Sequence, residues 1–310
     1  MKTKSIVAIT LLIISFMGCN AQNEKNEANF PELKGPYLGQ KPPGNVPELF
    51  VPEIMNAEHG YHFSIIFSPD LTEAFWKPME RGNNGLLYSK MQKGSWTLPQ
   101  RIDFGLEKGI GDACFSPDGN KLFFMSFQAP NVGDIERERI WFVERKSSGW
   151  SKPKLIDEII YSHPTHWTFS IATNGNLYFT SEIEGVRGEQ DIYVSRFDGE
   201  KYLQPEELGL AINSDGIDLC PYISPDESYL IFTRKGEGTK ETDLYISFKN
   251  SRGKWTEAVD MGKNINSEYH DLGPSISPDG KFLFFISRRG GNNNIYWVDA
   301  SIIDELKNNH

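Results

Sequence analysis

One short motif returns five times along the chain, and it limits the fold more than any other feature. Each copy joins a Ser-Pro-Asp-Gly-type turn to an apolar strand, most clearly in "SPDGNKLFFMS" and "SPDGKFLFFIS". The copies begin at Ser68, Ser116, Ala172, Ser224 and Ser277. A period of about fifty residues with short strands and regular turns is typical of a propeller or a similar array.

Each repeat contains the signals of four strands. An apolar strand leads into the turn, where Pro presets φ and Asp or Gly completes the reversal. A second strand follows, as at 122–124, and a polar loop precedes a third, as at 192–194. The fourth strand opens on an aromatic residue such as Trp150. Four antiparallel strands per repeat form the blade of an all-β propeller, whereas a solenoid would need capping repeats that this chain does not show.

Five repeats predict five blades, and six stays open if residues 31–60 hold more than one strand. The last repeat stops after its third strand at 294–299. Meanwhile "PELFVPEIMNAEHGYHFSIIFSPD" at 47–70 matches "WTEAVDMGKNINSEYHDLGPSISPD" at 255–279, so the N-terminal segment looks like a stray fourth strand. We therefore expect this N-terminal strand to complete the last blade and close a single propeller domain over 36–310.

The Ser-Pro-Asp-Gly strand pair, with "DIY" at 191–193, resembles the WD40-like repeat of TolB-type β-propellers. The likeness extends over essentially the whole of 36–310. Departures from it include Ala-Thr-Asn-Gly at 172–175 and Leu71 in place of Gly, but Asn-Gly is itself a strong turn. The resemblance implies the fold and no single activity, because such propellers serve as scaffolds, binding domains and a few enzymes.

The N-terminal segment predicts export. Residues 1–18 carry two lysines and then an apolar run, which is the pattern of a signal peptide. Phe-Met-Gly-Cys at 16–19 looks like a bacterial lipobox and implies acylation of Cys19, with an ordinary secretory signal as the alternative. Residues 19–35 are polar and predict a flexible tether. Asn20 is not the Asp that holds such proteins at the inner membrane, so we expect an outer-membrane lipoprotein facing the periplasm or the surface.

The net charge of the chain limits the classes of partner that we expect it to bind. The net charge is −10 and no basic cluster is present, which argues against nucleic acid. An acidic chain is not attracted electrostatically to anionic lipid. The acyl group on Cys19 would therefore be its only membrane anchor. We expect a monomer whose partner is an envelope protein or glycan. Cys114 and Cys220 lie mid-strand and are expected to be buried free thiols.

Tracing one blade separates two faces. The tight turns gather on one face, which we name the turn face, and the variable loops gather on the other, the loop face. Variable loops on a rigid scaffold usually carry the site, so we expect it on the loop face. The loops are 77–85, 127–138, 182–190, 234–242 and 288–293.

A ring of polar residues is expected where the first strands meet the loop face. One imidazole or carboxylate per blade would form it, from His62, Asp112, His166, Asp218 and Asp271. His and Asp together suit a divalent ion, with Zn or Mn favoured over Ca, so a metal at the channel mouth is a candidate cofactor. The ends of the second strands would add ligand-binding residues at Trp76, Lys77, Glu182, Arg234 and Arg288. The alternative is a structural ring that bonds to neighbouring backbone.

Two functions fit these features. The one we favour is a lipid-anchored, non-catalytic module that binds protein or glycan through the loop face. The alternative is a lyase or hydrolase on acidic oligosaccharides, since some relatives with this type of propeller cleave uronic-acid polymers at a His-containing metal site. There His62 or His166 would be ligand or base, and Arg234 or Arg288 would neutralise a substrate carboxylate. A serine peptidase is not expected, because no G-x-S-x-G elbow is present.

Overall fold

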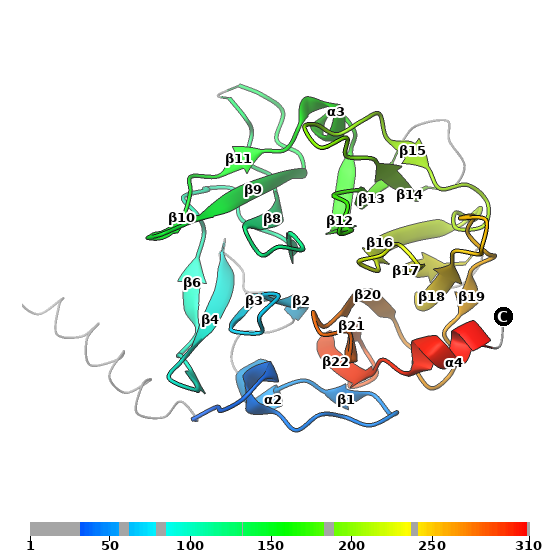
Figure 1. The fold of residues 1–310 in the computed structure, drawn as a ribbon, viewed down its shortest axis with the longest axis horizontal. Coiled ribbons are helices and arrows are strands. Elements are labelled where there is room, and N and C mark those ends of the chain that lie inside the picture. Colours follow the sequence, from blue (N-terminus) through cyan, green and yellow to red (C-terminus); the bar gives the residue numbers. More distant parts are fainter. Residues whose placement is uncertain are drawn as a thin grey trace, which may run out of the picture.

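The computed structural model describes residues 32–55, 62–78, 85–131, 133–182, 189–236 and 241–308. Within these ranges, five antiparallel sheets are arranged around a central axis (Figure 1). The chain is therefore a five-bladed β-propeller, which confirms the all-β fold and the five blades. No helix in the described ranges is long and apolar enough to cross a membrane.

The blades follow one another along the chain. The first is β2 (His62–Phe67), β3 (Glu73–Pro78), β4 (Leu86–Gln92) and β5 (Ser95–Trp96), with β6 (Gln100–Ile102) also on β4. The second is β7 (Ala113–Phe115), β8 (Lys121–Ser126), β9 (Arg139–Lys146) and β10 (Gly149–Trp150), with β11 (Lys154–Leu155) also on β9. The third is β12 (Thr165–Ile171), β13 (Leu177–Ser181), β14 (Asp191–Ser195) and β15 (Glu206–Glu207).

The last two blades repeat the plan. The fourth is β16 (Ile217–Ile223), β17 (Tyr229–Lys235), β18 (Asp243–Phe248) and β19 (Val259–Asp260). The fifth is β20 (Asp271–Ile276), β21 (Phe282–Ser287), β22 (Asn294–Asp299) and β1 (Glu48–Leu49). Short helical pieces are η1 (Tyr37–Gly39), α2 (Pro52–Met55), α3 (Glu158–Tyr161) and α4 (Ile302–Asn308).

The repeated turn is held by its own side chains. The Ser277 hydroxyl donates to Asp279 at 2.8 Å and accepts the Phe282 N–H at 3.0 Å. The fourth turn position takes a positive φ, +75° at Gly280, where Gly is favoured because it lacks a Cβ. Leu71 and Glu227 hold the same region, at +57° and +56°, in the two copies that lack Gly. The motif therefore survives substitution because the Ser–Asp bonds remain.

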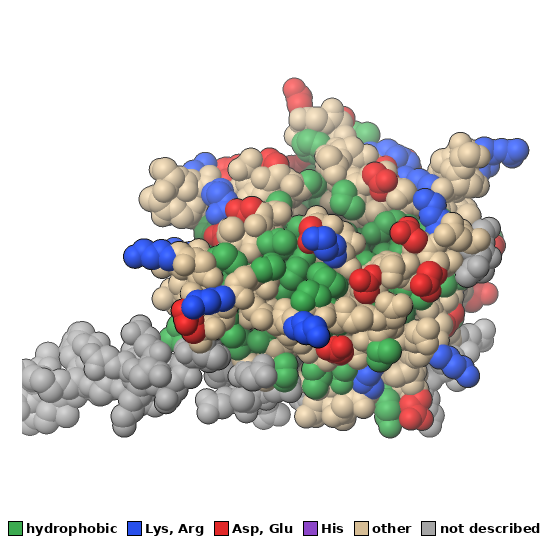
Figure 2. Space-filling model, turned by 60° about the horizontal axis from the view of Figure 1, so that its bottom comes forward, with side chains coloured by type: hydrophobic (Ala, Val, Ile, Leu, Met, Phe, Trp, Pro, Cys, Tyr) green, Lys and Arg blue, Asp and Glu red, His purple; other side chains and the backbone are tan. Residues whose placement is uncertain are grey.

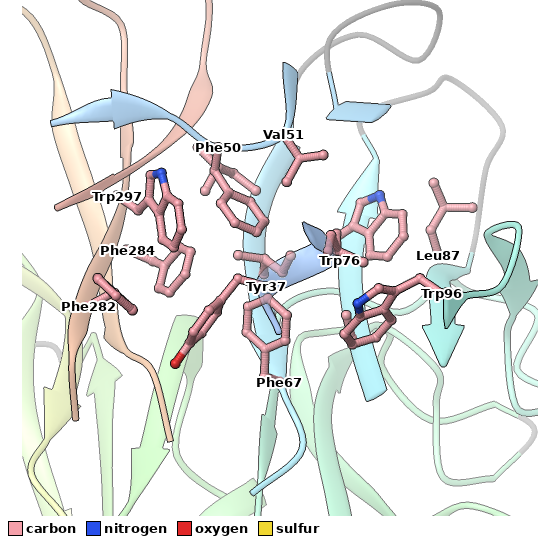
Figure 3. Close-up of a cluster of buried hydrophobic side chains, with 14 residues drawn as sticks. Tyr37, Phe50, Val51, Phe67, Trp76, Leu87, Trp96, Phe282, Phe284 and Trp297 are labelled. Atoms are coloured by element: carbon pink, nitrogen blue, oxygen red, sulfur yellow. The ribbon is translucent and has the colours of Figure 1, made fainter. Parts of the chain in front are cut away.

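The N-terminal strand closes the ring, as the sequence predicts. β1 pairs antiparallel with β22, with Glu48 opposite Trp297, and lies beside it in Figure 1. The Phe50 N–H extends the ladder to the Ile295 carbonyl at 2.9 Å. Figure 3 shows aromatic side chains from the N-terminal segment between those of the fifth and first blades. We name this cluster the closing seam: Tyr37, Phe50, Phe67, Phe284 and Trp297.

Cys114 and Cys220 are free thiols, and burial raises the pKa of each to about 12. The signal peptide predicted for 1–18 and the acylated Cys19 lie outside the described residues, as does most of the tether.

Candidate functional site

The channel along the propeller axis contains a cavity of about 340 Å³. The innermost strand of every blade contributes to its wall, through Ile66, Phe115, Ile171, Tyr222 and Ile276 among others. Every side chain that lines it is uncharged. We name this space the axial cavity.

The repeated turns set the mouth of the axial cavity. Pro is the second residue of the turn in four blades, and Thr takes its place in the third blade. These residues line the cavity: Pro69, Pro117, Thr173, Pro225 and Pro278. Five copies of one turn around an axis therefore form a ring of mostly apolar side chains. The cavity lies toward the turn face, whereas sequence reasoning directed attention to the loop face.

Two carboxylates of the expected ring are fully buried in matched networks. Asp218 accepts from the N–H and hydroxyl of Ser214, at 2.6 and 2.7 Å, and from Arg234 Nε at 2.7 Å. Asp271 accepts from the N–H and hydroxyl of Ser267 at the same two distances, and from Arg289 Nη2 at 2.9 Å. Both side chains are 0% exposed. Donors of the chain itself therefore occupy both carboxylates.

The arginines of these networks also hold backbone. Arg234 and Arg289 donate to the carbonyls of Ile212 and Ile265. Sequence reasoning selected Arg288, which donates instead to Asn293 Oδ1 at 2.7 Å, and missed Arg289. A signal was present, because the same Ile-Asn-Ser stands four residues before Asp218 and Asp271, counted from the Ser. Asn213 and Asn266 in those segments accept the N–H groups of Ile192 and Leu244.

Asp112 has a different environment. Its Oδ1 accepts the Ser64 hydroxyl at 2.6 Å, and its side chain is half-buried. Burial raises the pKa of Asp112 and the negative charge of Glu138 raises it further, whereas the hydrogen bond from Ser64 and the charge of Lys77 oppose the rise. Burial in turn lowers the pKa of Lys77. The charges of Asp112 and Lys77 therefore influence each other, and each group lies in a partly desolvated position.

His166 lies between two glutamates on the loop face. Its Nδ1 is 3.5 Å from Glu138 Oε2, and its Nε2 is 3.7 Å from Glu182 Oε2. Glu138, which sequence reasoning missed, thus connects His166 to the environment of Asp112. We name this group the loop-face cluster: Lys77, Asp112, Glu138, His166 and Glu182.

The remaining candidates lie elsewhere. His62 is in β2, but its side chain is outside what the structure describes. Trp76 is 1% exposed and packs in a hydrophobic cluster with Leu87 and Trp96 (Figure 3). His270, which sequence reasoning passed over, lies 2.8 Å from Glu241 through its Nε2. Among the described residues, no group of three or more His, Cys, Asp or Glu is arranged to hold a metal ion.

Comparison with known proteins supports the fold. No family model matches the chain. It is 27% identical over 203 residues to the uncharacterized peptidase YuxL of Bacillus subtilis (strain 168), a match to 57% of this chain and 29% of that protein. TolB from Acinetobacter baumannii superposes with a TM-score of 0.53 at 16% identity, covering 78% of this chain and 52% of TolB. A TolB-like protein from Agrobacterium tumefaciens gives 0.51 at 19% identity, covering 74% and 70%. The chain has a TolB-like propeller fold and spans about half of the first TolB and under a third of the peptidase.

Proposed function

We propose that this propeller is a non-catalytic binding module of the cell envelope that takes an uncharged part of its ligand into the axial cavity. The axial cavity carries this proposal. It has the size and the mostly apolar, preformed wall that are common in sites for small molecules. The five blades hold its wall in place through the packing of each sheet against the next.

The buried networks support a binding role over a catalytic one at Asp218 and Asp271. A carboxylate that accepts three hydrogen bonds from its own chain has its acceptor positions already occupied. To act on a substrate it would have to give up those bonds inside a dry environment, which costs several kcal/mol. These two residues therefore stabilise the scaffold around the channel.

The envelope location rests on the N-terminal sequence. Residues 1–18 supply the export signal, Cys19 the acylation site and 19–35 the tether. With lipid as the only anchor, Cys19→Ser should release the protein from the membrane fraction. Fractionation of cells that produce the two forms tests this, and membrane retention of Cys19→Ser would contradict it.

Binding in the axial cavity is tested with an uncharged fluorescent probe, N-phenyl-1-naphthylamine, on the Cys19→Ser chain. Ser275 lines the cavity on β20, so Ser275→Phe should fill part of it and weaken probe binding at least tenfold. Ser162→Phe, at an exposed position after α3, is the matched control and should leave binding unchanged. Equal binding by the wild-type and Ser275→Phe proteins, with both folded by circular dichroism, would contradict a site in the cavity.

A second candidate function is carbohydrate-active catalysis, and the loop-face cluster is the observation that favours it. The imidazole of His166 lies 3.5 Å from Glu138, and burial raises the pKa of Asp112; groups of these kinds can transfer protons. Arg234 argues against an acidic substrate. Sequence reasoning assigned it to the substrate carboxylate, but it is already bound to Asp218.

Ultraviolet assays for the unsaturated products of polygalacturonate and alginate cleavage separate the two functions. We expect no product from either polymer. Turnover by the wild-type protein that His166→Ala abolishes would overturn the non-catalytic proposal.

A further inference from the structure

The wall of the axial cavity determines which part of a ligand can enter. Among the described residues that line the cavity none is charged, and the hydroxyls of Ser64 and Ser170 are already bonded, to Asp112 and to the Pro221 carbonyl. A charge placed there without a partner would cost far more than apolar contact gains. The part that enters is therefore an apolar body with few polar atoms.

The rim of the cavity has the opposite character. In four blades an aspartate directly follows the proline that lines the mouth: Asp70, Asp118, Asp226 and Asp279. Ser116 and Ser277 line the cavity and donate to two of these carboxylates, so we treat the four aspartates as its rim. Each accepts the hydroxyl of the first serine of its own turn, at 2.6, 2.6, 2.9 and 2.8 Å in that order. The third blade has the neutral Asn174 at this position.

Hydrogen bonds keep the rim ionised. Bonds from Ser116 and from the Asn120 N–H lower the pKa of Asp118. Burial acts against the charge of Asp226, but bonds from Ser228 and Ser224 outweigh it and lower that pKa too. The pKa of Asp279 falls to about 2, because bonds from Tyr37, Lys281 and Ser277 exceed the effect of burial. At neutral pH the rim carries negative charge.

Cations of the chain offset only part of that charge. Lys281 Nζ is 2.9 Å from Asp279. Arg145 is bonded to Glu73 at 2.5 Å and also lies near Asp70. In the part of the chain that the structure describes, Asp118 and Asp226 form no ion pair with Lys or Arg. Figure 2 shows a face with hydrophobic side chains near its centre and charged side chains of both signs around them.

We propose that the axial cavity is specific for a hydrophobic amine, whose aryl or alkyl body fills the cavity while its ammonium group stays at the carboxylate rim. This inference rests on the proposed binding function and adds the class of ligand. The charge remains at the wet edge of the site, where attraction to Asp118 and Asp226 requires no burial of the ammonium group.

Three probes with one body test the charge preference: 4-phenylbutylamine, 4-phenylbutan-1-ol and 4-phenylbutanoate. Calorimetry on the Cys19→Ser chain should give the order amine, alcohol, carboxylate, with about a fivefold advantage of the amine over the alcohol, as expected for exposed ion pairs. That advantage should shrink as salt is added, because exposed charges are screened.

Rim variants locate the effect. Asp118→Asn combined with Asp226→Asn keeps an acceptor oxygen for each turn serine and removes two charges. It should abolish the advantage of the amine while the alcohol binds as before. Asp103→Asn removes an exposed charge outside these turns and should change nothing. Equal affinity for the amine and the alcohol in the wild-type protein would overturn the charge preference and leave the cavity in place. Failure of all three probes to bind would overturn the cavity as a site.

Discussion

At the scale of single residues, the repeat decides which polar groups are structural. The same Ser, Asp and Arg arrangement occurs around Asp218 and Asp271, although the arginine comes from β17 in one blade and from beyond the end of β21 in the other. Two independent solutions to one bonding pattern indicate that the pattern itself is needed. Its position, beneath the loop face, suggests that it fixes the loops to the strands.

Removing one partner of such a network should be costly. Asp218→Ala leaves the Arg234 guanidinium buried without its carboxylate, and we expect a loss of about 3–5 kcal/mol in the free energy of unfolding. Urea unfolding measures it. Arg288→Gln is the control, because Arg288 is bonded to an amide rather than to a carboxylate, and it should cost under about 1 kcal/mol. A stable Asp218→Ala protein would show that the network is not structural.

The bond between Tyr37 and Asp279 predicts a pH dependence. The Tyr37 hydroxyl donates to Asp279 at 2.5 Å and helps to lower the carboxyl pKa from 3.8 to about 2. A lowered native pKa stabilises the fold above the ordinary value of about 4, and that stability disappears as the pH falls toward 2. Tyr37→Phe should therefore cost about 1–2 kcal/mol at pH 6 and progressively less below pH 4.

Denaturant unfolding at several pH values checks this, with the exposed Tyr269→Phe as the control. A penalty that stays constant from pH 6 to pH 2 would mean that the hydroxyl acts through packing alone.

The residue scale is also where sequence reasoning was weakest. It could find the carboxylates from their distance to the turn, but it could not tell Arg288 from Arg289. That choice depends on how the chain leaves β21, where Arg289 reaches Ser287, Asp271 and the Ile265 carbonyl. Glu138 escaped notice for a similar reason, because it meets His166 only when the second and third blades pack together.

At the scale of elements, β1 contributes more through its neighbours than through its own ladder. It has two residues, but Phe50 beside it is 1% exposed, with its ring centroid 5.0 Å from that of Trp297 and 5.1 Å from that of Phe284. On the first blade, the Phe67 ring centroid lies 6.1 Å from that of Phe50, so this short edge strand is held by aromatic contacts on both sides of the ring junction.

Phe50→Ala should lower the free energy of unfolding by about 3–5 kcal/mol, because a buried aromatic ring is lost and the cavity it leaves cannot collapse fully. Thermal and urea unfolding measure the loss. Val46→Ala, four residues earlier at a position 72% exposed, should be almost neutral. Similar melting of the two variants would mean that the seam does not depend on this ring.

The element pattern itself was readable from sequence because turn, strand and loop signals recur in register. Bulges were not. Four innermost strands shift register at one place, and in three of them Trp167, Cys220 and Gly273 adopt φ of +62°, +54° and +61° there. Only one of the three is Gly, so local sequence does not mark the bulge. The convergence of inner strands on a common axis provides the cause.

At the scale of the whole molecule, each hydrophobic cluster joins neighbouring blades, as the closing seam does for the fifth and first. A blade that unfolds alone would expose two such surfaces. We therefore expect one cooperative transition, in which tryptophan fluorescence and far-ultraviolet circular dichroism change at the same urea concentration. Separate midpoints for the two signals would show that blades unfold independently.

The pairing of the first and last strands also determines when the ring can close during folding. Glu48 can pair only once Trp297 is available, and most of the polypeptide lies between these two residues. Contacts this distant in sequence form late, since the intervening chain must first be ordered. A chain emerging with its N-terminus first can build blades one after another, but it remains an open arc with an unpaired edge until the last strand arrives. Closure thus requires that β22 has been made, and chains shortened before β22 should stay open and prone to aggregation.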